Sequence, residues 1–284
     1  MDNIQKIVEQ LKAKQDKNDE KVSTRQKVSR NGDSTVSSTY HNEHIEPLHE
    51  LTYDVTRIIK TDPGELAERR VIAGLKGDPR STPFRMLRAQ IMQQFREHNW
   101  NTLAITGATQ NAGKSFIAAN LAVSVALELN QTVLLVDLDL RKPSIHKYFG
   151  FEPEYGLLDY MQNGVPIKNI LVNPGIERLV ILPGKGSTDE ASEIISSPKM
   201  IRLIEEMRSR YKSRIVIFDL PPLLSVDDAW VLLPHVDAGL LVVENGKNTE
   251  EEVTKSLQIL ERTNFIGAVL NKTDEENKNY YYNY

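Results

Sequence analysis

The residues most able to do chemistry lie in one stretch, Ala108 to Ser115, which reads Ala-Thr-Gln-Asn-Ala-Gly-Lys-Ser. It follows an apolar run that ends at Thr106 and precedes a helical pattern that starts at Phe116. Backbone N–H groups at a helix N-terminus, a lysine and a hydroxyl together form a cradle for phosphates. Ala108 replaces the first glycine of the usual phosphate loop, which this chemistry does not strictly need. The stretch predicts a phosphate site, with an ordinary strand-to-helix turn as the alternative.

Positions within this loop have separate expected roles. Gly113 lets the backbone approach the phosphates, Lys114 reaches the β- and γ-phosphates, and the Ser115 hydroxyl binds Mg²⁺. Asn271, after the last apolar run, is a candidate for contact with an adenine edge, with a plain turn as the alternative. The residues expected to hold the nucleotide are Ala108, Thr109, Gln110, Asn111, Ala112, Gly113, Lys114, Ser115, Phe116 and Asn271.

Carboxylates end two other apolar runs. Asp137 and Asp139 close the first run, and residues two apart in an extended segment project to the same side. Asp219 closes the second run, in the pattern of a Walker-B acid that orders the Mg²⁺ shell. Acids beside a phosphate loop can hold Mg²⁺ and accept a proton. A lone acid at a strand end is also typical of a helix cap or turn, but these acids together favour a site.

The C-terminal end is unusually rich in tyrosine. Four of the ten tyrosines in the chain fall in its last five residues, Tyr280, Tyr281, Tyr282 and Tyr284. They have neither helical spacing nor apolar neighbours, so we do not expect them in a core. The sequence favours a set of phosphate acceptors, with an aromatic tail adhering to a surface as the alternative.

Alternating strands and helices are expected to position these groups. Strands are predicted at 103–106, 133–137, 180–182, 215–219, 239–243 and 266–270, and helices at 114–129, 198–211 and 249–262. Near-continuous apolar strands separated by helices indicate an α/β fold with a mostly parallel sheet, flanked by helices on both faces. Ligands of such sheets bind beyond the carboxyl ends of the strands, where every motif above lies.

The chain divides into four expected parts: an amphipathic helix at 1–22, a mostly disordered linker at 23–70, a phosphate-loop domain at 71–273 and the tyrosine tail at 274–284. Ile4, Ile7, Val8 and Leu11 form the apolar stripe of the first part, which suits docking to a protein or a membrane surface. The alternative is a solvated helix.

The segment before the phosphate loop carries weaker patterns. Leu51, Val55, Ile58 and Ile59 have helical spacing, and Val71-Ile72 suits an edge strand or packing on the domain. A helix is expected from Pro83, with Thr82 as its N-cap. Its apolar face is formed by Phe84, Leu87, Ile91 and Phe95.

Composition excludes several classes of function. The net charge of −4 gives no reason to expect nucleic acid as a partner, and the absence of cysteine excludes disulfides and thiolate chemistry. No run approaches the roughly 18 apolar residues of a membrane span. The sequence therefore reads as a soluble, cytoplasmic protein that reaches a membrane through a partner or an amphipathic surface.

These motifs together resemble the bacterial tyrosine autokinases of exopolysaccharide and capsule assembly. The resemblance covers about residues 70 to 284 and rests on the loop at 108–115, the Walker-A′ stretch at 133–143, the strand ending at Asp219 and the tyrosine cluster. It implies an ATP- and Mg²⁺-dependent kinase that phosphorylates its own tail in trans, within a ring. It implies that Lys114, Asp137 and Asp139 are catalytic, with Asp137 as the base. It also implies that Ser115, Asp139 and Asp219 hold the Mg²⁺.

The family also carries an oligomerisation helix of the form Glu-x-x-Arg-x-x-Arg. Arg85 and Arg88 match it, but Thr82 stands where the family has glutamate, so we expect a weaker ring or another arrangement. The resemblance implies a separate transmembrane activator of the chain-length-determinant type, which would hold this chain at the inner face of the plasma membrane. It also implies a cognate tyrosine phosphatase, and it does not imply that the protein binds nucleic acid.

Two other functions remain open at this stage. One is a nucleotide-switched module of polysaccharide assembly that transfers little phosphate. The other is a positioning ATPase of the MinD/ParA group, which shares the fold and both Walker motifs. That group has a signature lysine where this chain has Thr109, and it lacks a tyrosine tail, so both features favour the kinase.

Overall fold

The computed structural model describes residues 56–210 and 213–273. The predicted N-terminal helix, most of the predicted linker and the tyrosine cluster lie outside the described residues. Their roles therefore stay predictions. Within the described ranges, no helix is long and apolar enough to cross a membrane.

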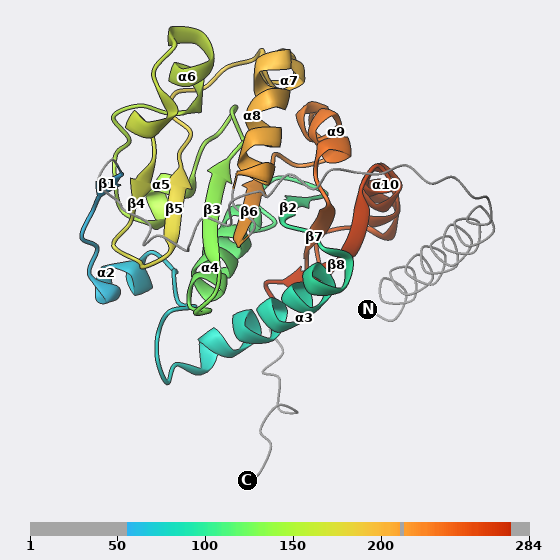
Figure 1. Ribbon diagram of the computed structural model, residues 1–284. Helices are drawn as coiled ribbons and strands as arrows, with labels where there is room; N and C mark the ends of the chain where they lie inside the picture. The colour runs from blue at the N-terminus through green and yellow to red at the C-terminus, as the bar shows by residue number, and fades with distance from the viewer. Residues whose placement is uncertain (1–55, 211–212, 274–284) are drawn as a thin grey trace, which may run out of the picture. The chain divides into compact units, whose positions relative to one another are not determined.

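An eight-stranded sheet forms the centre of the described unit, with the order β1-β4-β5-β3-β6-β2-β7-β8, which runs from left to right in Figure 1. All neighbouring strands are parallel except β4 and β5. The strands are β1 Arg57–Ile58, β2 Thr102–Gly107, β3 Thr132–Asp137, β4 Val172–Asn173, β5 Leu179–Leu182, β6 Arg214–Asp219, β7 Ala238–Glu244 and β8 Asn264–Asn271.

Helices cover both faces of this sheet, as the sequence predicted (Figure 1). Helices α3 and α4 pack on one another, and α4 lies on β2, β3 and β6. Helix α8 packs on β6, and α10 packs on β7 and β8. The right-handed crossovers β2-α4-β3 and β5-α8-β6 run in opposite directions along the sheet, which puts α4 and α8 on opposite faces. The helices are α2 Pro63–Glu68, α3 Thr82–His98, α4 Lys114–Ala126, α5 Ile145–Tyr148, α6 Leu157–Asn163, α7 Ala191–Ser196, α8 Pro198–Ser209, α9 Asp228–Leu232 and α10 Glu250–Leu260.

The apolar pattern explains why the central strands are correctly predicted to within two residues. Strand β2 is buried at all six positions, and β3 and β6 at five of six, because helices exclude water from both faces. Helix α4 is almost wholly buried, since its small residues let it lie close against the sheet. Ser197 caps α8 by accepting a hydrogen bond from the Met200 N–H.

The structure differs from the sequence prediction before residue 71. Ile58 lies in β1, which pairs with β4, and not in a helix. Asp62 caps α2 by accepting hydrogen bonds from the backbone N–H groups of Gly64 and Glu65. Residues 56–70 therefore belong to the folded unit and not to the predicted linker. Val71 and Ile72 pack into the core without forming a strand.

The start of α3 is also shifted by one residue. A short 3₁₀ turn at Pro79–Ser81 precedes it, so the Thr82 backbone is already helical and Ser81 takes the cap position. The Thr82 hydroxyl instead accepts a hydrogen bond from Arg85. The apolar face of α3 is as predicted, with Phe84, Ile91 and Phe95 buried.

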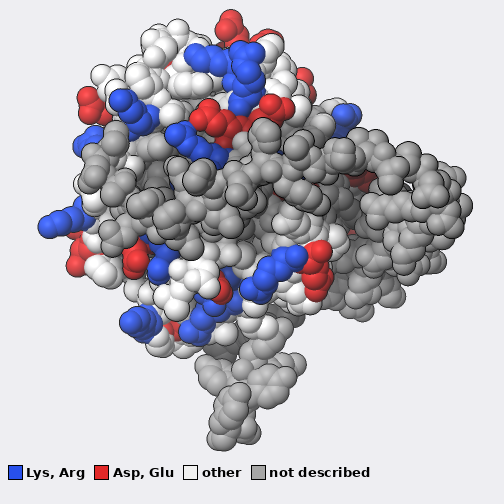
Figure 2. Space-filling model, viewed as in Figure 1, with Lys and Arg blue, Asp and Glu red and all other residues white. Residues whose placement is uncertain are grey.

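On the face shown in Figure 2, basic and acidic side chains of the described residues are interspersed. On that face, the charged side chains of the described residues do not form one large patch of a single sign.

Candidate active site

The phosphate loop connects β2 to α4, as predicted. Gly113 has φ +97°, a conformation that glycine adopts more readily than other residues. The Asn271 side-chain amide donates a hydrogen bond to the Ala112 carbonyl at 2.8 Å, and a Cβ atom on Gly113 would lie 2.1 Å from the Asn271 Nδ2. Asn271 therefore fastens the loop, and glycine is required at 113 by both its conformation and its space.

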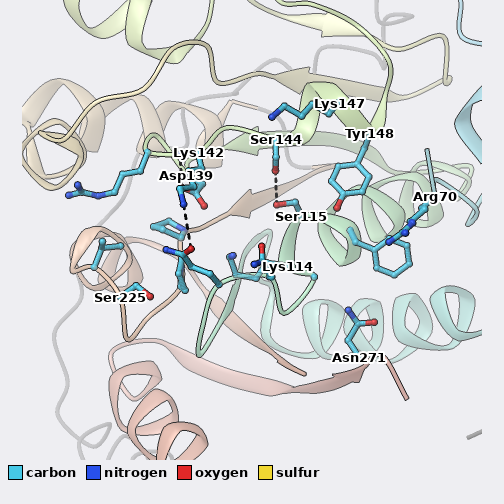
Figure 3. A pocket seen from close by; sticks show the side chains of 18 of the residues that line it. Arg70, Lys114, Ser115, Asp139, Lys142, Ser144, Lys147, Tyr148, Ser225 and Asn271 are labelled. Atoms are coloured by element: carbon cyan, nitrogen blue, oxygen red, sulfur yellow. Dashed lines mark hydrogen bonds between the residues drawn. The ribbon is translucent and has the colours of Figure 1, made fainter. Parts of the chain in front are cut away.

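Lys114, the first residue of α4, is buried to 7% exposure. Its side chain runs close over Gly107, where an added Cβ would lie 3.2 Å from the Lys114 Cγ. The Lys114 side chain lines the cavity shown in Figure 3. A cation is thus fixed where a phosphate loop needs it.

A cavity of about 690 Å³ opens beside the loop (Figure 3). Of the residues predicted to hold the nucleotide, those that line it are Gln110, Asn111, Gly113, Lys114, Ser115, Phe116 and Asn271. Ala108 and Ala112 are fully buried and do not line the cavity. Thr109 does not line it either, and its hydroxyl accepts a hydrogen bond from the Asn248 side-chain amide at 2.9 Å.

The structure brings the predicted acids together at the carboxyl ends of β3 and β6. Asp137 and Asp219 are fully buried, and Asp139 lines the cavity. The Asp137 Oδ2 accepts hydrogen bonds from the backbone N–H groups of Ser144 at 2.8 Å and Ile145 at 3.0 Å. Among the described residues, the Asp137 Oδ1 and both carboxylate oxygens of Asp219 have no partner in good hydrogen-bond geometry, although the Ser115 hydroxyl lies near enough to Asp219 to lower its pKa.

Burial changes how these acids ionise. It raises the pKa of Asp137 to about 7, opposed by the Ile145 and Ser144 N–H groups and assisted by the charge of Asp139. Burial also raises the pKa of Asp219 well above its ordinary value, assisted by Asp137 and opposed by Lys114. The pKa of Asp139 is raised by burial as well, and Lys114 opposes that rise. Without a cation, the Asp137 carboxyl group therefore titrates near neutral pH.

These residues fit a magnesium ion. Buried carboxylate oxygens without a partner lie beside the Ser115 hydroxyl, which accepts a hydrogen bond from the Ser144 hydroxyl at 2.9 Å. In residues 56–210 and 213–273, no group of three or more His, Cys, Asp or Glu side chains could hold a metal ion without further ligands. That suits Mg²⁺, which is usually held by one or two carboxylates together with substrate phosphates.

Several cavity residues were not predicted as site residues. Arg141 forms two hydrogen bonds with the fully buried Asp228, at 2.8 and 3.1 Å, so it ties the segment after β3 to α9. The Lys142 ammonium donates to Gln110 of the loop at 3.4 Å (Figure 3). Both follow the predicted acids in sequence, which could have indicated them. Arg70 and Tyr148 also line the cavity, and no local pattern indicates either.

The residues predicted for oligomerisation lie on α3. Arg85 is exposed and donates to the Thr82 hydroxyl at 2.8 Å. Arg88 is engaged within the chain, with its Nε 3.1 Å from a Glu128 carboxylate oxygen and its Nη1 donating to the Ser124 carbonyl at 2.9 Å. Arg88 therefore fixes α3 to the end of α4, in addition to any role between subunits.

Comparisons with known proteins identify the family of the chain. Residues 103–283 match the CobQ/CobB/MinD/ParA nucleotide binding domain family. The putative tyrosine-protein kinase CapB of Staphylococcus aureus is 32% identical over 212 residues, which are 72% of this chain and 92% of CapB. The putative tyrosine-protein kinase EpsB of Ralstonia nicotianae is 30% identical over 83% of this chain, but the match spans only 31% of EpsB.

A solved structure extends the likeness from sequence to fold. The kinase domain of the Escherichia coli tyrosine kinase ETK is 31% identical, with a TM-score of 0.67 over 80% of this chain and 94% of that domain. The chain therefore belongs to the bacterial tyrosine-protein kinases of the CapB, EpsB and ETK type, built on the nucleotide-binding domain shared with MinD and ParA.

Proposed function

We propose that the protein is an ATP-dependent tyrosine autokinase that phosphorylates its own C-terminal cluster, Tyr280, Tyr281, Tyr282 and Tyr284. One observation carries the proposal beyond family membership. The buried carboxyl groups of Asp137 and Asp219 act on one another, and Lys114 and Ser115 at the end of the phosphate loop lie close enough to Asp219 to lower its pKa. Such groups are costly to bury unless a cation and a phosphate complete them.

In this proposal the phosphate loop and Lys114 hold the triphosphate of ATP. The acceptor tyrosine oxygen attacks the γ-phosphorus, its proton passes to Asp137, and the bond between the γ-phosphorus and the bridging oxygen breaks to release ADP. A base works best when its pKa lies near the working pH, and burial places the pKa of Asp137 at about 7. Asp137 therefore suits a proton acceptor.

Ser115, Asp139 and Asp219 would hold the magnesium ion in this proposal. Bound there, Mg²⁺ supplies neutralisation of the charge on the β- and γ-phosphates. The donor set supports this because it offers a hydroxyl and carboxylate oxygens, which are the ligands Mg²⁺ prefers.

Burial also supports a different division of roles. Asp139 lines the cavity, whereas Asp137 is fully buried and does not. An acceptor hydroxyl that uses Asp137 has to reach below the cavity wall, while Asp139 is accessible from the cavity. Separate substitutions of Asp137 and Asp139 distinguish these arrangements.

The wider setting is proposed on the same basis. Transfer would occur in trans between subunits of a ring in which Arg85 and Arg88 lie at contacts, and the kinase would regulate exopolysaccharide or capsule polymerisation and export. A separate transmembrane protein of the chain-length-determinant type would activate it at the inner face of the plasma membrane. A cognate tyrosine phosphatase would reverse the modification.

A phosphotyrosine immunoblot after incubation of the full chain with Mg-ATP tests the proposal. We expect signal that maps to the terminal cluster and is absent when EDTA replaces Mg²⁺. ATP binding without phosphotyrosine would favour a nucleotide-switched assembly module instead. ATP hydrolysis with no phosphotyrosine would favour a positioning ATPase of the MinD/ParA group.

A further inference from the structure

A short segment outside the matched nucleotide-binding domain is fastened to the helix that follows the phosphate loop. Residues 69–73, which we call the strap, lie between α2 and α3. Asn120 of α4 is fully buried, and its Oδ1 accepts hydrogen bonds from the N–H groups of Ile72 at 2.7 Å and Ala73 at 3.0 Å. Its Nδ2 donates to the carbonyls of Arg70 at 2.9 Å and Phe116 at 3.0 Å. The Asn120 amide is therefore fully used in fixing the strap.

The strap holds Arg70 in an uncommon backbone conformation. Arg70 has φ +66°, which is unfavourable for a residue that carries a Cβ atom. Conformations of this kind persist where the surroundings fix them, and they cluster at functional sites. Two hydrogen bonds fix the backbone of Arg70. Its N–H donates to the Ala67 carbonyl, and its carbonyl accepts from the Asn120 side-chain amide.

The Arg70 side chain is directed to the nucleotide cavity. It lines the same cavity as Lys114 and Ser115. Figure 3 shows it beside Tyr148, with Lys114 between this end of the cavity and Ser225. The charge of Arg70 is also close enough to oppose the rise in the pKa of Tyr148 that burial and Asp219 cause. Arg70 thus lies at the end of the cavity that also holds Tyr148, and it lines the same cavity as Lys114 and Ser115.

The Arg70 guanidinium has no anionic partner among the described residues, unlike two other cations that line this cavity. Arg141 is paired with Asp228, and Lys272 is paired with Glu244 at 3.0 Å. No ion pair or side-chain hydrogen bond engages the side chain of Arg70 in residues 56–210 and 213–273. A guanidinium offers five N–H donors in a fixed plane that matches a phosphate group. Its free donors therefore face a cavity whose other features suit a polyphosphate.

We infer that Arg70 is a nucleotide-binding residue that donates hydrogen bonds to a phosphate of bound ADP or ATP, and that Asn120 is the positioning residue that holds it there. The inference rests on the proposed function in one respect, that this cavity takes a nucleotide. It adds a contact supplied by the strap, which lies before residue 103, where the matched nucleotide-binding domain begins.

Titration calorimetry of the full chain with Mg-ADP and Mg-ATP tests the inference. Arg70→Gly removes the guanidinium and also suits a positive φ, so we expect about tenfold weaker binding with an unchanged or higher melting temperature. Arg70→Lys keeps the charge without the planar fork, so an intermediate loss is expected. Lys76→Ala removes one exposed charge just beyond the strap and should bind like the wild type.

Asn120→Ala tests the positioning role. We expect it to weaken Mg-ADP binding although it touches no nucleotide, and to speed hydrogen exchange at the amides of Ile72 and Ala73. Combined with Arg70→Gly it should add little further loss, because both changes remove the same contact.

Three results would overturn the inference in distinguishable ways. A wild-type chain that binds neither Mg-ADP nor Mg-ATP overturns the proposed function itself. Wild-type binding with equal affinity in Arg70→Gly overturns the inference alone. Unchanged nucleotide affinity with a raised KM for an acceptor peptide would assign Arg70 to the acceptor instead, which also overturns it.

Discussion

Asp137 and Asp219 are paired directly across the sheet: the last residue of β3 lies opposite the last residue of β6. Neighbouring strands lie about 4.8 Å apart, so two carboxyl groups meet at one dry point of the sheet. Both are fully buried. Burial is the main reason that the pKa of each acid is raised, and the charge of Asp137 raises the pKa of Asp219 further.

The first prediction follows from the raised pKa of Asp137. Its pKa is about 7 in the folded chain, against an ordinary value of 3.8. Between these values the folded state holds a proton that the unfolded state has lost, so without Mg²⁺ the free energy of unfolding falls as pH rises from about 4 to about 7. Asp137→Asn keeps an acceptor for Ser144 and Ile145 and removes this titration. At pH 8 the variant should be more stable, by up to about 4 kcal/mol.

Urea unfolding in EDTA at pH 5 and pH 8 measures this difference. Glu261→Gln, which changes an exposed carboxylate, should follow the wild type at both values. Equal losses of stability in wild type and Asp137→Asn on going to pH 8 would contradict the prediction.

The second prediction separates the roles of the acids. If Asp137 is the base, Asp137→Asn lowers kcat by two to four orders of magnitude, roughly the usual contribution of general base catalysis, and keeps most of the affinity for Mg-ATP. Asp219→Asn should instead raise the Mg²⁺ concentration needed for half-maximal activity. If Asp139→Asn loses kcat with normal Mg²⁺ dependence while Asp137→Asn remains active, the acceptor uses the cavity-facing acid.

The third prediction concerns Lys114. Its aliphatic chain packs over Gly107, and methionine can keep that packing while removing the charge. Lys114→Met should therefore fold normally and lose detectable phosphotyrosine. Circular dichroism and an immunoblot on the same preparation measure both properties. A folded Lys114→Met chain with unchanged autophosphorylation would contradict the phosphate-loop assignment.

The fourth prediction uses the close approach at Gly113. Gly113→Ala combines an unfavourable positive φ with a contact to the Asn271 amide that is too short. We expect it to abolish nucleotide binding and to lower stability by about 1–3 kcal/mol. The double variant with Asn271→Ala relieves the contact but not the backbone conformation, so it should regain only part of the stability. Full recovery would show that the positive φ costs little.

The fifth prediction concerns the tail. Residues 274–279 form a polar spacer that spans about 20 Å when extended. Strand β8 ends at Asn271, which contacts the phosphate loop, so we expect a spacer of this length to reach a neighbour's site more easily than its own. We expect transfer in trans, and each phosphate adds about −1.5 to −2 charges at pH 7. Phosphorylation should therefore dissociate the oligomer.

The measurement mixes a Lys114→Met chain that has an intact tail with an active chain that lacks residues 280–284. Phosphotyrosine should appear on the inactive chain, and light scattering of phosphorylated full-length protein should show loss of large species. Labelling confined to active full-length chains, at a rate independent of protein concentration, would exclude transfer in trans.

The sequence predicted the parts of this protein that are encoded locally. Long apolar strands and contiguous motifs identified β2, β3 and β6 with Lys114 and Asp219. It did not reveal β1 or β4, because each has only two residues and is fixed by pairing with distant strands. The pairing of Asp228 with Arg141 and the approach of Arg70 to the cavity depend on segments brought together only by folding. No pattern in one stretch of chain encodes such contacts.

The packing of α3 on α4 has a practical consequence for expressing this protein. The matched domain begins at residue 103, after α3 has ended. Phe84, Ile91 and Phe95 of α3 are buried, and Phe84 meets Phe116 of α4 with ring centroids 5.6 Å apart. A chain trimmed to the matched domain would expose the apolar surface that α3 covers, and surfaces of that kind promote aggregation. The smallest soluble fragment should therefore begin near Thr56.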